Sequence, residues 1–180
     1  RSALEGLKRR ASEPLLSRLL LGAYAGFQGK PLDWGSGGPE RWPEAQPYST
    51  PDGSEDQRGF RIADWYLTLS DTILETRLPL LMLGISGPAD DGADLLEARQ
   101  QAAGLLMGEE YEQLEPLPKQ VLGGAFFLLS APEGSIEAEH SWYEHDGTAK
   151  PGTEMYLSGQ SSVSSKGGAE FLFAHYLLLP

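Results

Sequence analysis

The sequence predicts a predominantly helical α+β fold that ends in a small antiparallel hairpin or sheet. Apolar residues recur at three- and four-residue intervals over most of the chain before residue 130, which is the period of an amphipathic helix. After Ser130, apolar residues instead alternate with polar ones, as they do in a strand with one exposed face. Helices that come first and strands that follow them are typical of the α+β class.

The length and composition predict one domain with three regions. The chain has 180 residues, of which 40% are hydrophobic, and this is enough to build a core in a domain of ordinary size. We expect a helical arm over residues 1–27, an extended loop over residues 28–59 and a helical body over residues 60–180. No run of about 18 or more apolar residues occurs, so we expect a soluble protein without a membrane span.

Residues 1–27 are predicted to form the amphipathic helical arm. Ser2 and Glu5 have the spacing of a capping box at the start of a helix. Ser12 can cap a second helix, because Pro14 is tolerated in a first helical turn. An apolar stripe follows, made of Leu15, Leu16, Leu19, Leu20, Ala23 and Phe27. An arm with such a stripe must bury it against the body or a partner.

Residues 28–59 hold six Gly and five Pro, a composition that excludes a helix or a central strand. The same segment carries Trp34, Trp42 and Tyr48, and disordered linkers seldom contain so many aromatic residues. We therefore predict an extended loop held in place by its aromatic side chains. These three side chains are predicted to anchor a partner protein, with packing on the protein's own helices as the alternative.

The body is predicted to begin with a helix from about Arg61 to Met82, which Pro79 kinks or ends. Carboxylates suit the positive end of a helix dipole, and the next helix is expected to begin near Asp90, Asp91 and Asp94. A short apolar helix is expected over residues 119–129. A strand of the predicted hairpin follows over residues 136–142, and residues 155–157 are its candidate return strand. Residues 170–179 are expected to form a helix or a buried strand.

The charge distribution favours a protein partner. A net charge of −12 argues against nucleic acid, which requires a basic binding face. Residues 1–59 are neutral overall, and the acidic excess lies in residues 60–180. The only dense basic cluster is Lys8, Arg9 and Arg10, which we count among the partner-binding residues. An acidic surface is also what an inhibitor or immunity protein of a basic partner would present.

The residue types that are missing set further limits. The chain has no cysteine, which excludes disulfides, thiol catalysis and zinc–thiolate sites. It begins with Arg1 rather than Met. This start fits a mature form that has lost a targeting segment, with an intracellular or organellar location, and it equally fits a sequence that simply starts there.

No catalytic residue, cofactor or metal site is predicted. The glycines near residues 26–38 do not match dinucleotide or phosphate-loop spacing, and no serine lies in a nucleophile elbow. His140 and His145 are five residues apart and are expected to point to opposite faces of a strand. If the protein is instead an enzyme with a dispersed site, the first candidates are Asp64, Asp71, His140, Glu144 and His145.

Two segments resemble the opening of the ADP-ribosylglycohydrolases. These are Leu20-Leu21-Gly22-Ala23-Tyr24-Ala25-Gly26 and the later Ser70-Asp71-Thr72, together about a tenth of the chain. Members of that family hold magnesium with an acidic residue after the first glycine pair and with paired aspartates before the threonine. Phe27 and Ser70 stand at the expected acidic positions here, and the family's later aspartate-rich motif is missing. The resemblance therefore implies a degenerate, catalytically inactive relative.

These observations favour a non-enzymatic interaction protein or accessory subunit of a larger assembly. It is expected to dock through its amphipathic arm and through the aromatic loop, with Trp34, Trp42 and Tyr48 as anchors. The acidic inhibitor, the enzyme with a dispersed site and the degenerate glycohydrolase remain as alternatives.

Overall fold

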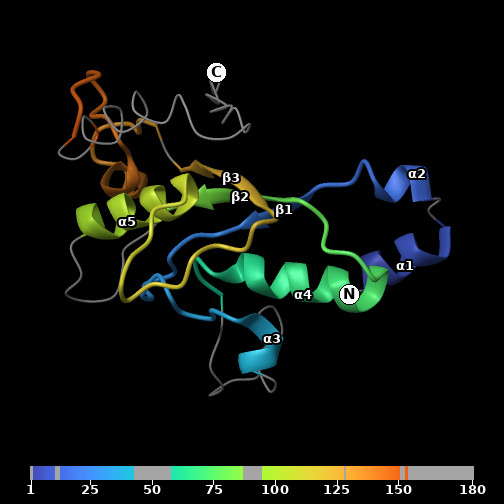
Figure 1. The fold of residues 1–180 in the computed structure, drawn as a ribbon. Helices are drawn as coiled ribbons and strands as arrows, with labels where there is room; N and C mark the ends of the chain where they lie inside the picture. The colour runs from blue at the N-terminus through green and yellow to red at the C-terminus, as the bar shows by residue number, and fades with distance from the viewer. Residues whose placement is uncertain are drawn as a thin grey trace, which may run out of the picture.

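The computed structural model describes residues 2–10, 13–42, 58–86, 95–127, 129–150 and 153. Its elements alternate between helix and strand along the chain (Figure 1). The helices are α1 (Ser2–Arg10), α2 (Glu13–Leu16), α3 (Gly38–Arg41), α4 (Ile62–Leu74), α5 (Leu95–Met107) and the 3-10 helix η1 (Ile136–His140). The strands are β1 (Leu21–Tyr24), β2 (Leu80–Ile85) and β3 (Val121–Phe126). Among the helices in these ranges, none is long and apolar enough to cross a membrane.

The three strands form one parallel sheet in the order β1-β2-β3. Leu80 at the centre pairs with Leu21 on one side and with Val121 on the other. Helix α4 connects β1 to β2, and α5 connects β2 to β3. This alternation is the Rossmann-like arrangement of a mixed α/β fold, so the predicted α+β class is wrong.

The predicted C-terminal hairpin is also wrong for the described residues. Residues 136–140 form η1, because their backbone bonds are local: Ala138 N donates to Ser135 O and Ser141 N to Ala138 O. Tyr143 makes only isolated bridges, to Ser130 and Ala149. The predictions for residues 155–157 and 170–179 lie outside the described ranges.

Part of each of two predicted helices is a strand in the structure. Residues 121–126, expected to be helical, are β3, and the second helix of the arm ends at Leu16, before β1. The helix expected from Arg61 is confirmed as α4, but it ends at Leu74 because Glu75 adopts a left-handed conformation (φ 59°). Beyond it the chain turns into β2, which runs through the second half of the apolar segment.

The core lies between one face of the sheet and the two connecting helices. Ala23, Met82 and Ile85 point into it from the sheet, and Ala102 and Leu105 from α5. Helix α5 approaches the sheet closely at Gly124, where an added Cβ would lie 2.9 Å from Leu106 Cδ1. A second apolar cluster at the amino edge of the sheet joins α1 and α2 to the end of α4; it comprises Ile73, Leu74 and Leu78, with Leu4, Leu7, Leu16, Leu19 and Leu21.

Candidate functional site

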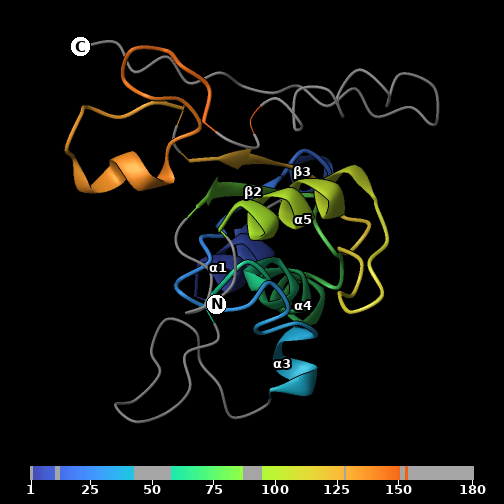
Figure 2. The same ribbon diagram turned by 90° about the vertical axis from the view of Figure 1, so that its left-hand side faces the viewer.

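Helices α4 and α5 pack on one face of the sheet, and the helices of the described ranges leave the opposite face open along its length (Figure 2). Alternation along the strands places Gly22 and Tyr24 of β1, Leu81 and Leu83 of β2, and Leu122 of β3 on this open face. Parallel sheets occur almost only with both faces covered. The open face is therefore the least expected feature of the fold.

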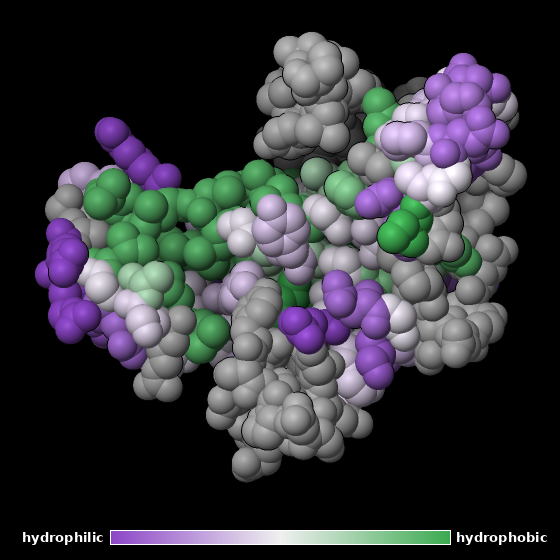
Figure 3. Space-filling model, turned by 180° about the vertical axis from the view of Figure 1, so that it is seen from behind, coloured by the Kyte–Doolittle hydropathy of each residue, from purple (hydrophilic) through white to green (hydrophobic). Residues whose placement is uncertain are grey.

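Large apolar side chains continue this surface at both ends of the strands. Leu20 precedes β1 and Phe127 follows β3, and by alternation both share the open side. We call Leu20, Tyr24, Leu81, Leu83, Leu122 and Phe127 the apolar face. Tyr24 is 78% exposed and Leu122 is 50% exposed. Viewed from behind, hydrophobic atoms form a band that runs from the end near α1 to the middle of the molecule (Figure 3). Large exposed apolar patches are a common feature of interaction sites.

A shallow pocket of about 500 Å³ opens beside the apolar face, at the carboxyl ends of β1 and β2. It is lined by Tyr24, Gly26, Gln28, Gly29, Gly84, Ser86 and His140. In open parallel sheets this edge is where ligands bind. Because Tyr24 belongs to both, the pocket is continuous with the apolar face. It offers a recess in which a side chain from a partner can insert.

The turn after β1 gives the pocket its shape. Phe27 is fully buried beneath it, and its N–H donates to Ser86 O at 2.7 Å. Gln28 follows in a left-handed conformation (φ 57°), which is uncommon for a residue other than glycine. Gly84 (φ 61°) lets the Tyr24 ring lie close, since its Cβ would be 3.1 Å from Tyr24 Cδ1. Backbone constraints on both strands thus hold the Tyr24 ring at the pocket.

The first turn of α4 contacts the loop that precedes α3, through the side chain of Asp64. Asp64 Oδ2 accepts hydrogen bonds from Gly37 N at 2.9 Å and from Arg61 Nε at 3.1 Å. Arg61 also donates to the carbonyls of Glu115 and Pro116. Burial raises the pKa of Asp64 above 3.8, although the positive charge of Arg61 opposes the shift. Both side chains are buried and their partners belong to the chain itself, so the pair is structural.

The aromatic residues of the loop pack partly on one another. The Trp34 and Trp42 rings lie 5.9 Å apart, and the Lys30 ammonium lies 4.5 Å from the Trp34 ring centre. Trp42 donates from Nε1 to Ser36 O at 3.0 Å and packs against the core. Both indoles are half-buried, so own-chain contacts account for part of their surface. Tyr48 lies outside the described residues.

The basic cluster lies on α1. Lys8 Nζ contacts Glu75 Oε1 at 2.7 Å and so connects α1 to the end of α4. The Lys8 ammonium lowers the pKa of Glu75 through this hydrogen bond. Arg9 and Arg10 are exposed, and neither forms an ion pair with another described residue. They remain available to a partner, whereas Lys8 has a role within the chain.

The candidates for a dispersed active site are not collected into a metal-type cluster. Asp64 and Asp71 lie in the first and last turns of α4, and Asp71 pairs with Arg77 at 3.1 Å. His140 lines the pocket, while His145 lies 3.8 Å from Glu133. The described part of the chain contains no group of three or more His, Asp or Glu placed to hold a metal.

The positions that resemble metal ligands of the ADP-ribosylglycohydrolases are buried and structural. Phe27 packs edge-on against Phe60, with ring centres 6.0 Å apart. Ser70 Oγ donates to Leu67 O and accepts from Leu78 N, which joins α4 to the segment leading into β2. Neither side chain is exposed.

Sequence reasoning did not find the apolar face. A four-residue strand such as β1 gives too short an alternation to be separated from a helical stripe, although Leu20, Gly22 and Tyr24 do alternate with residues on the core side.

Comparison of the chain with protein-family models, with curated proteins and with solved structures finds no match.

Proposed function

We propose that this protein is a non-enzymatic interaction subunit that binds another polypeptide through the apolar face. The observation that carries the proposal is the parallel sheet whose second face presents Tyr24, Leu83 and Leu122 without a covering helix in the described ranges. Because such sheets are covered on both sides in stable assemblies, a binding partner is the natural second layer.

The energetics of the apolar face favour binding. Burying one large apolar side chain completely contributes about 1.5–3 kcal/mol. Leu20, Leu122 and Phe127 are each near half exposed, so each stands to contribute roughly 1 kcal/mol more when a partner covers it. Tyr24 adds an aromatic ring with a polar tip, the side-chain type that is enriched among interface hot spots.

The proposed class of function is the one predicted from the sequence, but the main binding surface is the apolar face and not the aromatic loop. Trp34 and Trp42 bury part of their surface against each other, and Trp42 also packs against the core. The side chains of Tyr24 and Leu122 are more open to solvent. We therefore assign the primary contact to the apolar face. Arg9 and Arg10 on α1 are exposed and remain candidates for secondary contacts with the partner.

Site-specific photo-crosslinking tests the proposal in cells that make the protein. We expect a benzophenone side chain at position 122 to give adducts of discrete mass with a polypeptide, because that position lies at the contact. The matched control is position 97 on α5, on the other side of the molecule and exposed, where no discrete adduct is expected. Absence of adducts at positions 20, 83 and 122 in a folded protein would refute the proposal.

A further inference from the structure

We propose that the partner is a second copy of this chain, packed face to face about a two-fold axis that crosses the strands, an inference that rests on the proposed function. A two-fold interface is self-complementary, since the same patch is used by both copies. With the axis across the strands, the strands of the two copies run in opposite directions. The amino edge of one sheet then lies over the carboxyl edge of the other.

The amino edge of the apolar face is basic. Helices α1 and α2 lie at this edge, beside the end of α4 (Figure 1). Arg9 and Arg10 of α1 and Arg18 just before β1 are exposed. None of the three forms an ion pair with another residue of the described ranges. The acidic residues nearby are already used, because Glu75 pairs with Lys8 and Asp71 with Arg77.

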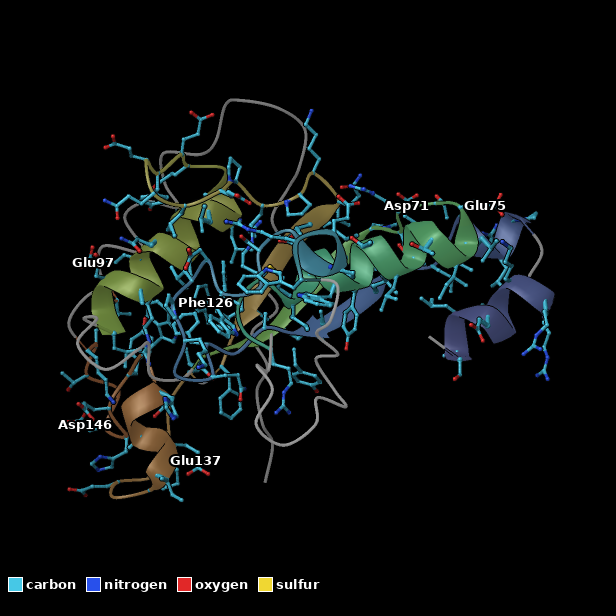
Figure 4. All side chains as sticks on the ribbon, turned by 90° about the horizontal axis from the view of Figure 1, so that it is seen from below. Asp71, Glu75, Glu97, Phe126, Glu137 and Asp146 are labelled. Carbon is cyan, nitrogen blue, oxygen red and sulfur yellow. The ribbon has the colours of Figure 1, made fainter. Side chains whose placement is uncertain are left out.

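The carboxyl edge of the apolar face is acidic. Figure 4 shows Glu137 on η1 and Asp146 near this helix, at the end of the molecule remote from α1. Glu133 and Glu144 belong to the same segment and are exposed. The N–H of Thr148 donates to Asp146 and lowers the pKa of that carboxyl, so Asp146 stays ionised. This edge therefore carries a negative charge at neutral pH.

The exposed apolar residues have the same two-ended distribution. Leu15 and Leu20 lie at the basic edge, while Phe127 and Leu129 lie beyond the carboxyl end of β3; all four are between 43% and 51% exposed. In the antiparallel arrangement, the leucines at the basic edge of one copy oppose the end of β3 in the other. Each copy supplies both halves of each contact, as a two-fold interface requires.

The charges select this arrangement from the other face-to-face packing. With the axis along the strands, basic edge would meet basic edge and acidic edge would meet acidic edge, which is unfavourable. Each copy carries a net charge of −12, so unspecific self-association is disfavoured. The antiparallel arrangement is the one of the two that brings opposite charges together at both ends of the interface.

Analytical ultracentrifugation of the full chain, combined with charge reversal, tests this inference. We expect wild type to be a dimer at micromolar concentration and Leu122→Asp to be a monomer. Reversing the basic edge (Arg9→Glu, Arg10→Glu and Arg18→Glu) is expected to raise the dimer dissociation constant at least tenfold. Adding Glu133→Arg, Glu137→Arg and Glu144→Arg restores opposite charges at both contacts and returns the net charge to the wild-type value, so the dimer should re-form.

The possible outcomes distinguish a second copy of this chain from a different polypeptide and from no partner at all. Suppose that the wild type stays monomeric at every concentration while position 122 crosslinks to a different polypeptide. The partner is then not a second copy of this chain, but the proposed function still holds. A monomeric wild type without any crosslink overturns both. If the variant with all six substitutions is folded by circular dichroism but remains monomeric, the antiparallel pairing of the basic and acidic edges is wrong.

Discussion

Replacing Arg61 with methionine is expected to lower the free energy of unfolding by about 3–5 kcal/mol at neutral pH, as removal of one partner of a buried ion pair typically does. Arg61 and Asp64 are 5% and 7% exposed, and Arg61 Nη2 lies 3.0 Å from Asp64 Oδ2. The variant would leave the Asp64 carboxylate buried, and its Oδ1 has no partner among the described residues even in the wild type. The carbonyls of Glu115 and Pro116 would also lose their donor.

The pH dependence of this variant separates an electrostatic cause from simple loss of packing. Burial raises the pKa of Asp64 above 3.8 and Arg61 opposes that shift, so removal of Arg61 raises the pKa further. A raised native pKa means that the native state binds the proton more tightly than the unfolded chain. The free energy of unfolding of the variant therefore falls as pH rises from below 3.8 through the native pKa. Its deficit against wild type should be smaller at about pH 4 than at about pH 7.

Urea unfolding monitored by tryptophan fluorescence measures both effects. Arg41→Met is the matched control, because Arg41 pairs with Glu115 at 3.1 Å but both side chains are more than half exposed. An exposed pair contributes at most about 1 kcal/mol. Equal losses in the two variants, or a loss in Arg61→Met that does not change with pH, would contradict the assignment of a buried structural pair.

Replacing Phe27 with alanine is expected to lower the free energy of unfolding by about 3–5 kcal/mol. The side chain is fully buried and packs edge-on against Phe60, so its removal leaves a cavity that a well-packed core closes only in part. Because the buried Phe27 side chain supports the turn that lines the pocket beside Tyr24, the variant should also disturb this pocket.

Thermal unfolding of Phe27→Ala measures the expected loss. Ile136→Ala serves as the control, since Ile136 is 84% exposed and its truncation should change stability by no more than about 0.5 kcal/mol. A loss below about 1 kcal/mol for Phe27→Ala would show that the turn is not anchored in the core as described.

The sequence was most informative where a helix is amphipathic and long enough to show its period. Helix α4 follows the predicted stripe, with Ile62, Trp65 and Ile73 all buried. The parallel strands were missed because such strands are buried on the core side and short, so they read as apolar runs without a clear two-residue period. The alternation at residues 136–142 was real, but no strand of the described ranges lies beside it, and local backbone bonds form η1 instead.

The candidate site depended on features that a linear pattern does not contain. Leu20, Leu83 and Leu122 are separated by many residues, and only the register of the parallel sheet places them on one face. Trp34 and Trp42 were singled out for their residue type, and the structure adds that they contact each other and the chain's own backbone. The basic cluster was visible as a run of charges, but the pairing of Lys8 with Glu75 required the fold.

The most direct test of the central proposal is hydroxyl-radical footprinting of side chains in the protein as it is isolated from its cells, compared with the chain unfolded and refolded alone at high dilution. If a polypeptide covers the apolar face, Tyr24 and Leu122 should be several-fold less reactive in the native preparation. Tyr111, on the core side beside Gly104 of α5, should react equally in both. Equal reactivity of Tyr24 and Leu122 in the two preparations would mean that the face stays open to water, and the proposed interaction would then be wrong.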